Sequence, residues 1–205
     1  MELQHIDKAT IASWDRFYRA NAINALVGVK PVSLIGTISA DGIPNVAVFS
    51  SIVHLGSNPT LIGYINRPRA AAPDTLANIE ATGVYTINHI HATFVAQAHQ
   101  TSAKYPSEVD EFDAVGLTPI YRKGCIAPFV QESMLQYQLQ LVEIVPIQHN
   151  GTFLVIGSVE NIWLPNNALQ ADGFIDVASL GAVSSAGNDA YYTTQLLQRF
   201  AYAKP

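Results

Sequence analysis

Short extended runs follow one another closely along this chain, and this spacing constrains its fold more than any other feature. Runs at 32–39, 45–53 and 61–66 are rich in β-branched and aromatic residues, which is typical of strands. Asp41-Gly42 between the first two runs is a strong hairpin signal. The second and third runs are joined by residues 54–60 only. We therefore expect the three strands to form an antiparallel meander.

Three further strands are expected at 84–90, 135–141 and 153–159, the last two flanking a hairpin signal at Asn150-Gly151. Residues 135–141 alternate between apolar side chains and the glutamines Gln136, Gln138 and Gln140, which indicates a strand with one wet face. Helical periodicity predicts helices at 11–26, 74–81 and 91–99. For the second helix, Asp74 or Thr75 is the expected N-cap.

Strands at this spacing, with helices inserted rather than alternating, favour a mainly β fold: a closed antiparallel barrel with helical excursions. No composition break or repeat marks a linker, so we expect one domain over residues 1–205. Within it, residues 1–28 are expected to be a helical N-terminal extension. Residues 165–205 are expected to be a tail that packs on the barrel or on a partner subunit.

Composition narrows the functional classes. Apolar residues make up 49% of the chain and charged residues only 13%, which favours a large core and a surface partly covered in an oligomer. The net charge of -5 and the scattered basic residues argue against nucleic acid as a partner. No apolar run approaches the ~18 residues that span a membrane, and Cys125 has no second cysteine to pair with. We expect a cytoplasmic location.

Several chemistries lack their motifs. The chain has no G-x-G-x-x-G, no G-x-x-x-x-G-K-[ST] and no G-x-S-x-G, which argues against the Rossmann cradle, the P-loop and the serine hydrolase elbow. His89, His91 and His99 are the candidate metal ligands, with His89 and His91 on one face of a strand. Because no ligating carboxylates are evident nearby, we favour hydrogen-bonded histidines over a metal site.

An ordered set of short motifs resembles the flavin-reductase-like family. It begins with K-P-V-S-L-I-G-T at 30–37, D-G at 41–42 and N-V-A-V-F-S-S at 45–51, and continues with N-P-T-L-I-G at 58–63 and D-T-L-A-N-I at 74–79. Y-T-I-N at 85–88, A-H-Q-T-S-A-K-Y at 98–105, E-F at 111–112, G-L-T-P at 116–119, A-P at 127–128 and E-S at 132–133 extend it. The resemblance runs from Val29 to Val159 in the family's order.

This resemblance implies an FMN-binding, antiparallel Greek-key split β-barrel that forms a homodimer with the flavin near the subunit interface. The flavin ring is expected along strand 45–51, where small Ala47 admits the ring and Phe49 offers apolar cover; the alternative is an ordinary barrel strand with its serines in solvent. The expected cofactor-binding residues are Asn45, Val46, Ala47, Val48, Phe49, Ser50, Ser51, Arg67, Arg69, Thr75, Asn78, Ser102, Ala103 and Lys104.

The phosphate needs cations and donors, which Arg67, Arg69, Lys104, the serines and the helix N-terminus at 74–78 would supply. The chain departs from the family at Pro73, where relatives often carry a basic residue. Phosphate binding from that position is therefore expected to be lost. Tyr191-Tyr192 resembles the family's closing pair, and is expected either to reach the active site or a partner subunit, or to anchor packing.

The expected activity is transfer of hydride from NADH or NADPH to flavin N5, with onward transfer to a flavin or small-molecule acceptor. The flavin would carry the chemistry, so no catalytic side chain is assigned. One alternative is a flavin-binding electron carrier or an oxidoreductase on a small organic substrate. Another is a cofactor-free barrel that serves as a binding module.

Overall fold

The computed structural model describes residues 2–71 and 73–204, and is built mainly of antiparallel strands. Met1, Ala72 and Pro205, which the predicted domain includes, lie outside the described residues. The strands are β1 (Lys30–Pro31), β2 (Ser33–Ile38), β3 (Pro44–Phe49), β4 (Ile52–Ser57), β5 (Thr60–Asn66), β6 (Val84–His89), β7 (Pro119–Arg122), β8 (Cys125–Val130), β9 (Gln136–Ile147), β10 (Thr152–Trp163), β11 (Val183–Ala186) and β12 (Ala190–Thr193). The helices are α1 (Lys8–Ser13), α2 (Arg16–Leu26), α3 (Asp74–Thr82), the 3-10 turn η1 (Ala92–Phe94), α4 (Val95–Gln100) and α5 (Glu111–Val115).

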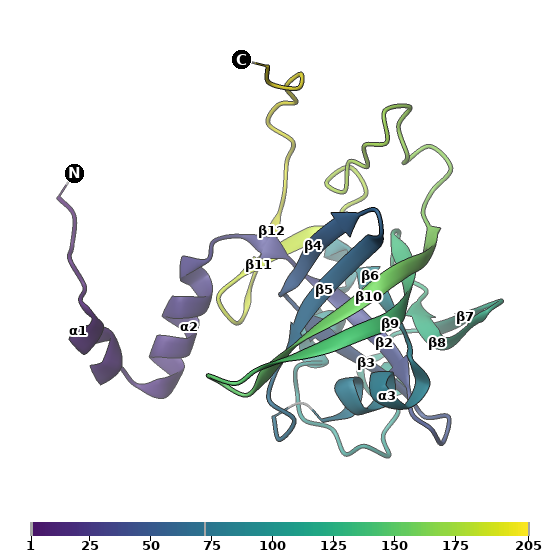
Figure 1. Cartoon of the computed structure of the whole chain (residues 1–205), viewed down its shortest axis with the longest axis horizontal. Coiled ribbons are helices and arrows are strands. Elements are labelled where there is room, and N and C mark those ends of the chain that lie inside the picture. Colours follow the sequence, from purple (N-terminus) through teal and green to yellow (C-terminus); the bar gives the residue numbers. More distant parts are fainter. Residues whose placement is uncertain (1, 72, 205) are drawn as a thin grey trace.

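The main sheet has seven strands in the order β3-β2-β6-β9-β10-β5-β4, all paired antiparallel (Figure 1). The predicted meander is wrong, because β3 and β4 lie at opposite edges of this sheet. The predicted strand 45–53 is interrupted at Ser50-Ser51, and these two residues carry the chain from one edge to the other. Since so short a link joins the two edges, the sheet must curl until they meet there, which is the geometry of a split barrel.

We call the link Ser50-Ser51 the serine corner, and hydrogen bonds hold it to β5. The Ser51 hydroxyl donates to the Ile65 carbonyl at 3.0 Å and accepts from the Ile65 N–H at 3.2 Å. On the far side of the sheet, β2 passes close to β8 at Gly36. A Cβ built there would lie 2.2 Å from the Pro128 carbonyl oxygen, so only glycine permits this approach.

The predicted helix 11–26 is split into α1 and α2 at Trp14-Asp15. Asp15 caps α2, because its carboxylate accepts hydrogen bonds from the N–H groups of Phe17 and Tyr18. Neither helix has a buried residue, and both extend away from the barrel (Figure 1). The N-terminal segment therefore presents an exposed apolar surface.

Helix α3 closes one end of the barrel and occupies nearly the predicted range. Its N-cap is Pro73 rather than Asp74 or Thr75, and no described side chain accepts a hydrogen bond there. The predicted helix 91–99 is found as η1 followed by α4. The left-handed Gly83 ends α3 and leads directly into β6.

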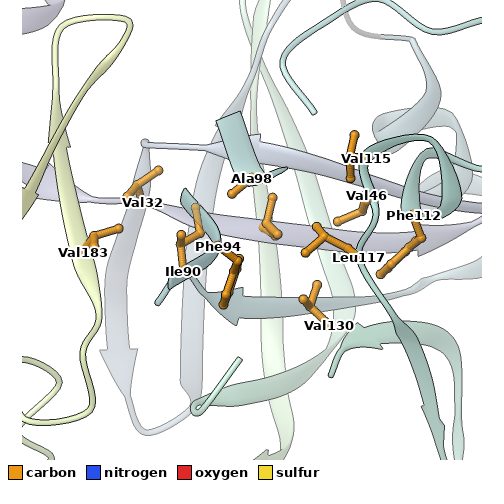
Figure 2. Close-up of a cluster of buried hydrophobic side chains, with 11 residues drawn as sticks. Val32, Val46, Ile90, Phe94, Ala98, Phe112, Val115, Leu117, Val130 and Val183 are labelled. Atoms are coloured by element: carbon orange, nitrogen blue, oxygen red, sulfur yellow. The ribbon is translucent and has the colours of Figure 1, made fainter. Parts of the chain in front are cut away.

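The buried core has two main apolar clusters. One lies between β2, β3 and the helices η1, α4 and α5, and includes Phe94 and Phe112 (Figure 2). The other fills the barrel around Tyr64 and Tyr85. Full burial of Phe112, at about 1.5–3 kcal/mol, fixes α5 against β3 and thereby positions the residue before it, Glu111.

The sequence predicted that the three glutamines of 135–141 face solvent from strand β9, and this prediction is wrong for two of them. Gln136 and Gln138 are 2% and 5% exposed. Gln136 donates to the Val130 carbonyl and accepts from the Arg122 guanidinium, so the β7–β8 hairpin covers this face. Amide side chains tolerate this burial because the hairpin satisfies their hydrogen bonds.

Within the described ranges, no helix is both long and apolar enough to cross a membrane.

Candidate functional site

A cavity of about 480 Å³ lies beside β3, the sheet edge next to the serine corner. Its walls come from β3, the N-terminus of α3, the 101–105 loop and the β11–β12 hairpin. Most of the predicted cofactor-binding residues line it: Asn45, Ala47, Val48, Phe49, Ser50, Ser51, Arg67, Thr75, Ser102, Ala103 and Lys104. Segments far apart in the sequence thus converge on one cavity, of a volume usual for small-molecule sites.

Strand β3 offers unpaired backbone groups to this cavity. It pairs with β2 on one side only, so its outward-facing N–H and C=O groups have no strand partner among the described residues. The Val46 N–H is directed toward the Glu111 carboxyl, whose charged form it favours, and therefore points outward from the sheet. Because backbone direction alternates with period two, the amide of Val48 faces the same way. This edge can supply a donor and an acceptor to a planar polar ring.

The side chains of β3 provide apolar cover. Ala47 and Val48 are half-buried on the cavity wall, and Phe49 is 8% exposed with its ring packed edge-on to Tyr64 at 4.8 Å. Val46, in contrast, does not line the cavity, because its fully buried side chain belongs to the first core cluster.

A buried hydrogen-bonded network lies behind the cavity. Asn45 accepts from the hydroxyls of Thr37 and Thr75, at 3.1 and 3.3 Å. The predicted site residue Asn78 donates to Thr37 at 3.1 Å, and lies outside the main cavity. Asn78 therefore acts on the cavity indirectly. It holds Thr37, which donates to Asn45, and Asn45 in turn accepts from Thr75.

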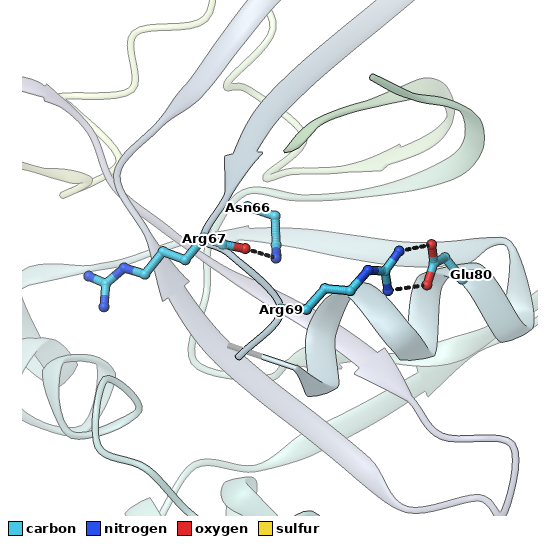
Figure 3. Close-up of polar contacts among 4 residues, drawn as sticks. All are labelled: Asn66, Arg67, Arg69 and Glu80. Atoms are coloured by element: carbon cyan, nitrogen blue, oxygen red, sulfur yellow. Dashed lines mark hydrogen bonds and ion pairs between the residues drawn. The ribbon is translucent and has the colours of Figure 1, made fainter. Parts of the chain in front are cut away.

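The two predicted phosphate arginines have different surroundings. Arg69 forms a two-pronged ion pair with Glu80 on α3 and lies over the Phe153 ring at 5.1 Å. Arg67 forms no ion pair with any described residue and lines the cavity. Figure 3 shows the two guanidiniums pointing in opposite directions. Only Arg67 is thus placed for a ligand.

The N-terminus of α3 is a further anion-binding feature. Pro73, Asp74 and Thr75 line the cavity, and the first-turn N–H groups of α3 are not capped by any described side chain. Uncapped amides at a helix N-terminus favour negative charge. Position 73 therefore offers no side-chain cation, and the uncapped first turn of α3 borders the cavity. Lys104 is an exposed cation on the facing loop.

The predicted serines differ in what their hydroxyls do. The Ser51 hydroxyl is engaged with Ile65, whereas the Ser50 hydroxyl makes no hydrogen bond within the described segments and is half-buried on the wall. In the 101–105 loop, Ser102 and Ala103 are exposed at the cavity rim.

Two features of the site were not identified from the sequence. Glu111, at the start of α5, is 7% exposed and lines the cavity. Burial, against the opposing effect of the Val46 N–H and with smaller contributions from the charges of Asp74 and Asp110, raises the pKa of its carboxyl to about 7. Glu111 belongs to the E-F motif of the family pattern, but no local signal in the sequence indicated that this residue contacts β3.

The second missed feature is the wall formed by the β11–β12 hairpin. The Tyr191 hydroxyl lies 3.1 Å from His99 Nδ1, and the two rings pack edge-on at 5.7 Å. Tyr191 packs on the first core cluster, as one alternative predicted, and it also lines the cavity.

The described part of the chain contains no cluster of three or more His, Cys, Asp or Glu side chains arranged to hold a metal ion. His89 packs against the Tyr137 ring, and burial lowers its pKa to about 4. His91 hydrogen-bonds to Thr93.

Comparison with known proteins agrees with this geometry. A split-barrel structure from Shewanella frigidimarina, whose name proposes a flavin reductase, is 44% identical, with a TM-score of 0.94 over 98% of this chain and 100% of that one. An FMN-binding protein from Thermus thermophilus shares the fold, with 15% identity and a TM-score of 0.70 over 98% of both chains.

Among curated relatives, an uncharacterised Aquifex aeolicus protein is 32% identical over 124 residues, which is 60% of this chain and 63% of the relative. The chain thus spans less than two thirds of that relative. The flavin reductase like domain family matches residues 29–180. Since this match covers most of the chain, the protein belongs to the flavin reductase like domain family.

Proposed function

We propose that this protein binds FMN in the cavity beside β3 and transfers hydride from NADH or NADPH to flavin N5. The observation that supports this most directly is the cavity itself. An unpaired strand edge, an uncapped helix N-terminus and two cations line it together, in a member of a family named for flavin reduction.

The residues of the cavity fit the parts of FMN. The backbone of β3 at Val48 and the Ser50 hydroxyl suit the polar edge of the ring, and Ala47 and Phe49 suit its faces. Arg67, Lys104 and the first-turn amides of α3 suit the phosphate, with Thr75, Ser102 and Ala103 beside them. Val46, Asn78 and Arg69 act indirectly in this proposal, through the core, the buried network and α3.

Bound FMN would supply the hydride acceptor and the onward electron transfer, so the protein need supply only placement and electrostatics. Backbone donors on β3 would orient the ring and stabilise charge that develops on it. The fold has no dinucleotide-binding βαβ unit among its described elements, so the nicotinamide would lie directly against the ring. In this proposal the nicotinamide would lie beside the wall formed by the His99–Tyr191 pair and the β11–β12 hairpin.

We further propose a single domain over residues 1–205 that acts as a cytoplasmic homodimer. The support for the dimer is the N-terminal extension, where Phe17, Leu26 and Val27 are 75%, 80% and 73% exposed on helices with no buried residue. An apolar surface of this kind indicates a protein partner. Residues 165–205 are proposed to pack partly on the barrel, through β11 and β12, and partly on the partner subunit.

The test begins with the visible spectrum of the purified protein, before and after addition of FMN. We expect a yellow protein, or uptake of FMN with quenching of its fluorescence. No chromophore and no uptake would refute the proposal in favour of a cofactor-free module. Anaerobic addition of NADH, and separately NADPH, should then bleach the flavin. Persistently oxidised flavin would leave an electron carrier or another oxidoreductase.

The two arginines provide a matched pair for the phosphate assignment. Arg67→Ala should weaken FMN binding by about tenfold or more, since a charge-assisted hydrogen bond contributes about 1.5–3 kcal/mol. Arg69→Ala removes the same charge from the same loop but should change the FMN affinity by less than about threefold. Equal losses in the two variants would remove Arg67 from the site.

A further inference from the structure

The most unusual group on the cavity wall is the carboxyl of Glu111. Its side chain is 7% exposed, and its Oε2 atom is fully buried without a hydrogen-bond partner in the described structure. Buried unpaired carboxylate oxygens are costly, so such an atom in a native protein requires an explanation. Among the described residues, the backbone N–H of Val46 is the group that favours the charged form of this carboxyl.

Glu111 also occupies a special position between two cavities. It lines the main cavity and a second one of about 250 Å³, together with Asn45 and Asp74, which line both. The second cavity is bordered by the 106–109 segment, of which Pro106, Ser107 and Glu108 are exposed. Glu111 thus lies on a wall between the proposed flavin site and a smaller polar pocket, where a proton could reach it without crossing the flavin.

The charged neighbours of Glu111 disfavour a second negative charge. Strand β3 contributes no titratable group, and the surrounding elements contribute more acids than bases. The acids are Asp74 on α3, Asp110 at the start of α5, Asp41 and Glu108 at the second cavity, and Asp189 at the main cavity. The basic residues, all at the main cavity, are Arg67, His99 and Lys104. A ligand that fills the main cavity would remove water from this carboxyl and bring a phosphate dianion nearby. Both effects disfavour its ionised form.

We propose that Glu111 couples FMN binding to proton uptake, so that FMN is bound by the form of the protein in which this carboxyl carries a proton. This inference rests on the proposed flavin site. Protonated Glu111 presents no charge to the cavity and still accepts from the Val46 N–H through its carbonyl oxygen. Ionised Glu111 would instead oppose the incoming phosphate.

The expected change of the FMN dissociation constant with pH follows from proton linkage. With a carboxyl pKa of about 7, the dissociation constant for FMN should rise by up to about fifteenfold between pH 7.0 and pH 8.5. At pH 8.5, FMN binding should take up nearly one proton, because the unliganded carboxyl is then almost fully ionised. This range is chosen because phosphate monoesters, with a second pKa of about 6, are already dianions there.

The experiment is isothermal titration of the full-length protein with FMN in buffers of different ionisation enthalpy, which counts protons directly. Glu111→Gln keeps the acceptor for the Val46 N–H and cannot ionise. It should bind FMN with the same affinity at both pH values and take up no proton. His99→Gln should keep the proton uptake of the wild type, because it removes an imidazole from the same cavity wall and leaves the Glu111 carboxyl in place.

Asp74→Asn gives an independent test. It removes a neighbouring charge, and should move the midpoint of the affinity-versus-pH curve to lower pH even if Glu111→Gln fails to fold. A wild type that binds FMN equally at both pH values overturns the inference and leaves the flavin site intact. So does a Glu111→Gln variant that still takes up a proton, or an unmoved midpoint in Asp74→Asn. Failure to bind FMN at any pH overturns the proposed function and the inference together.

Discussion

Replacement of Glu111 by Gln should stabilise the protein at alkaline pH, even without a ligand. The pKa of this carboxyl is about 7 in the folded protein and 4.5 as its reference value. The folded state therefore binds more protons than the unfolded state between these pH values, and stability falls as the pH rises through them. At about 1.4 kcal/mol for each pH unit of difference, the ionised carboxyl costs about 3 kcal/mol above pH 7.

In the wild type, the titration of His89 offsets this fall of the free energy of unfolding with pH. Burial lowers its pKa from 6.5 to about 4, so the unfolded state binds more protons and stability rises with pH between these values, by a similar ~3 kcal/mol. The two slopes have opposite signs over nearly the same range, and the wild-type stability should change little between pH 4.5 and 6.5. Removal of Glu111 alone should expose the rising slope of His89.

The measurement is urea unfolding at pH 4.5, 6 and 8, followed by tryptophan fluorescence, for the wild type and Glu111→Gln. We expect the difference between the two free energies of unfolding to grow in favour of the variant by about 3 kcal/mol from pH 4.5 to pH 8. Glu143→Gln removes an exposed carboxylate that lines neither cavity and controls for the loss of one charge. A Glu111→Gln difference that stays constant with pH would refute the assignment of a destabilising buried charge.

Three further predictions follow from the fold. Gly36→Ala should unfold the protein or cost more than about 3 kcal/mol in urea unfolding, because its Cβ would meet the Pro128 carbonyl at 2.2 Å; a loss below 1 kcal/mol would contradict the close approach. The double variant Phe17→Ser, Leu26→Ser should convert the proposed dimer into a monomer in light scattering with little loss of thermal stability, because both side chains are exposed; an unchanged mass would exclude this surface from the interface. His89→Gln should leave the opposite slope of Glu111 uncompensated, so that the free energy of unfolding falls by about 3 kcal/mol between pH 4.5 and pH 7; a profile as flat as that of the wild type would contradict a buried neutral imidazole.

Much of the fold could be predicted because strand signals are local. Turn residues such as Asp41-Gly42 lie between β2 and β3 as expected, and the family resemblance correctly indicated the split barrel. The sheet order could not be predicted locally. Nothing within 45–53 distinguishes one long strand from two that lie at opposite edges, since the break at Ser50-Ser51 depends on Ile65, which reaches this corner only in the folded barrel.

Burial of polar residues was hard to predict for the same reason. The alternation at 135–141 correctly indicated a strand, but Gln136 is covered by a hairpin that precedes it in sequence and offers it hydrogen bonds. A glutamine on a strand favours solvent unless a partner is known. That partner, Arg122, could not be identified from the spacing of residues.

In the candidate site, too, some features could be predicted from the sequence and others could not. The motif at 45–51 and the cations Arg67 and Lys104 come together in one cavity, because a family pattern carries information about long-range placement. Arg69 could not be separated from Arg67 by sequence, since its ion pair with Glu80 requires α3 to lie beside the 67–69 loop. Glu111 was missed because burial, not residue type, gives it its role.

The charge distribution of the cavity indicates how the protein would divide its binding energy for FMN. The ring end is rigid: β3 is fixed by its pairing with β2, and Phe49 is held against Tyr64. The phosphate end depends on the exposed side chains Arg67 and Lys104, where water and salt screen part of the attraction for a phosphate. Pro73 leaves α3 with bare amides there, but Asp74 places a carboxylate next to them. Ring contacts should therefore dominate the affinity, and protonation of Glu111 lowers the local negative charge that the phosphate has to overcome.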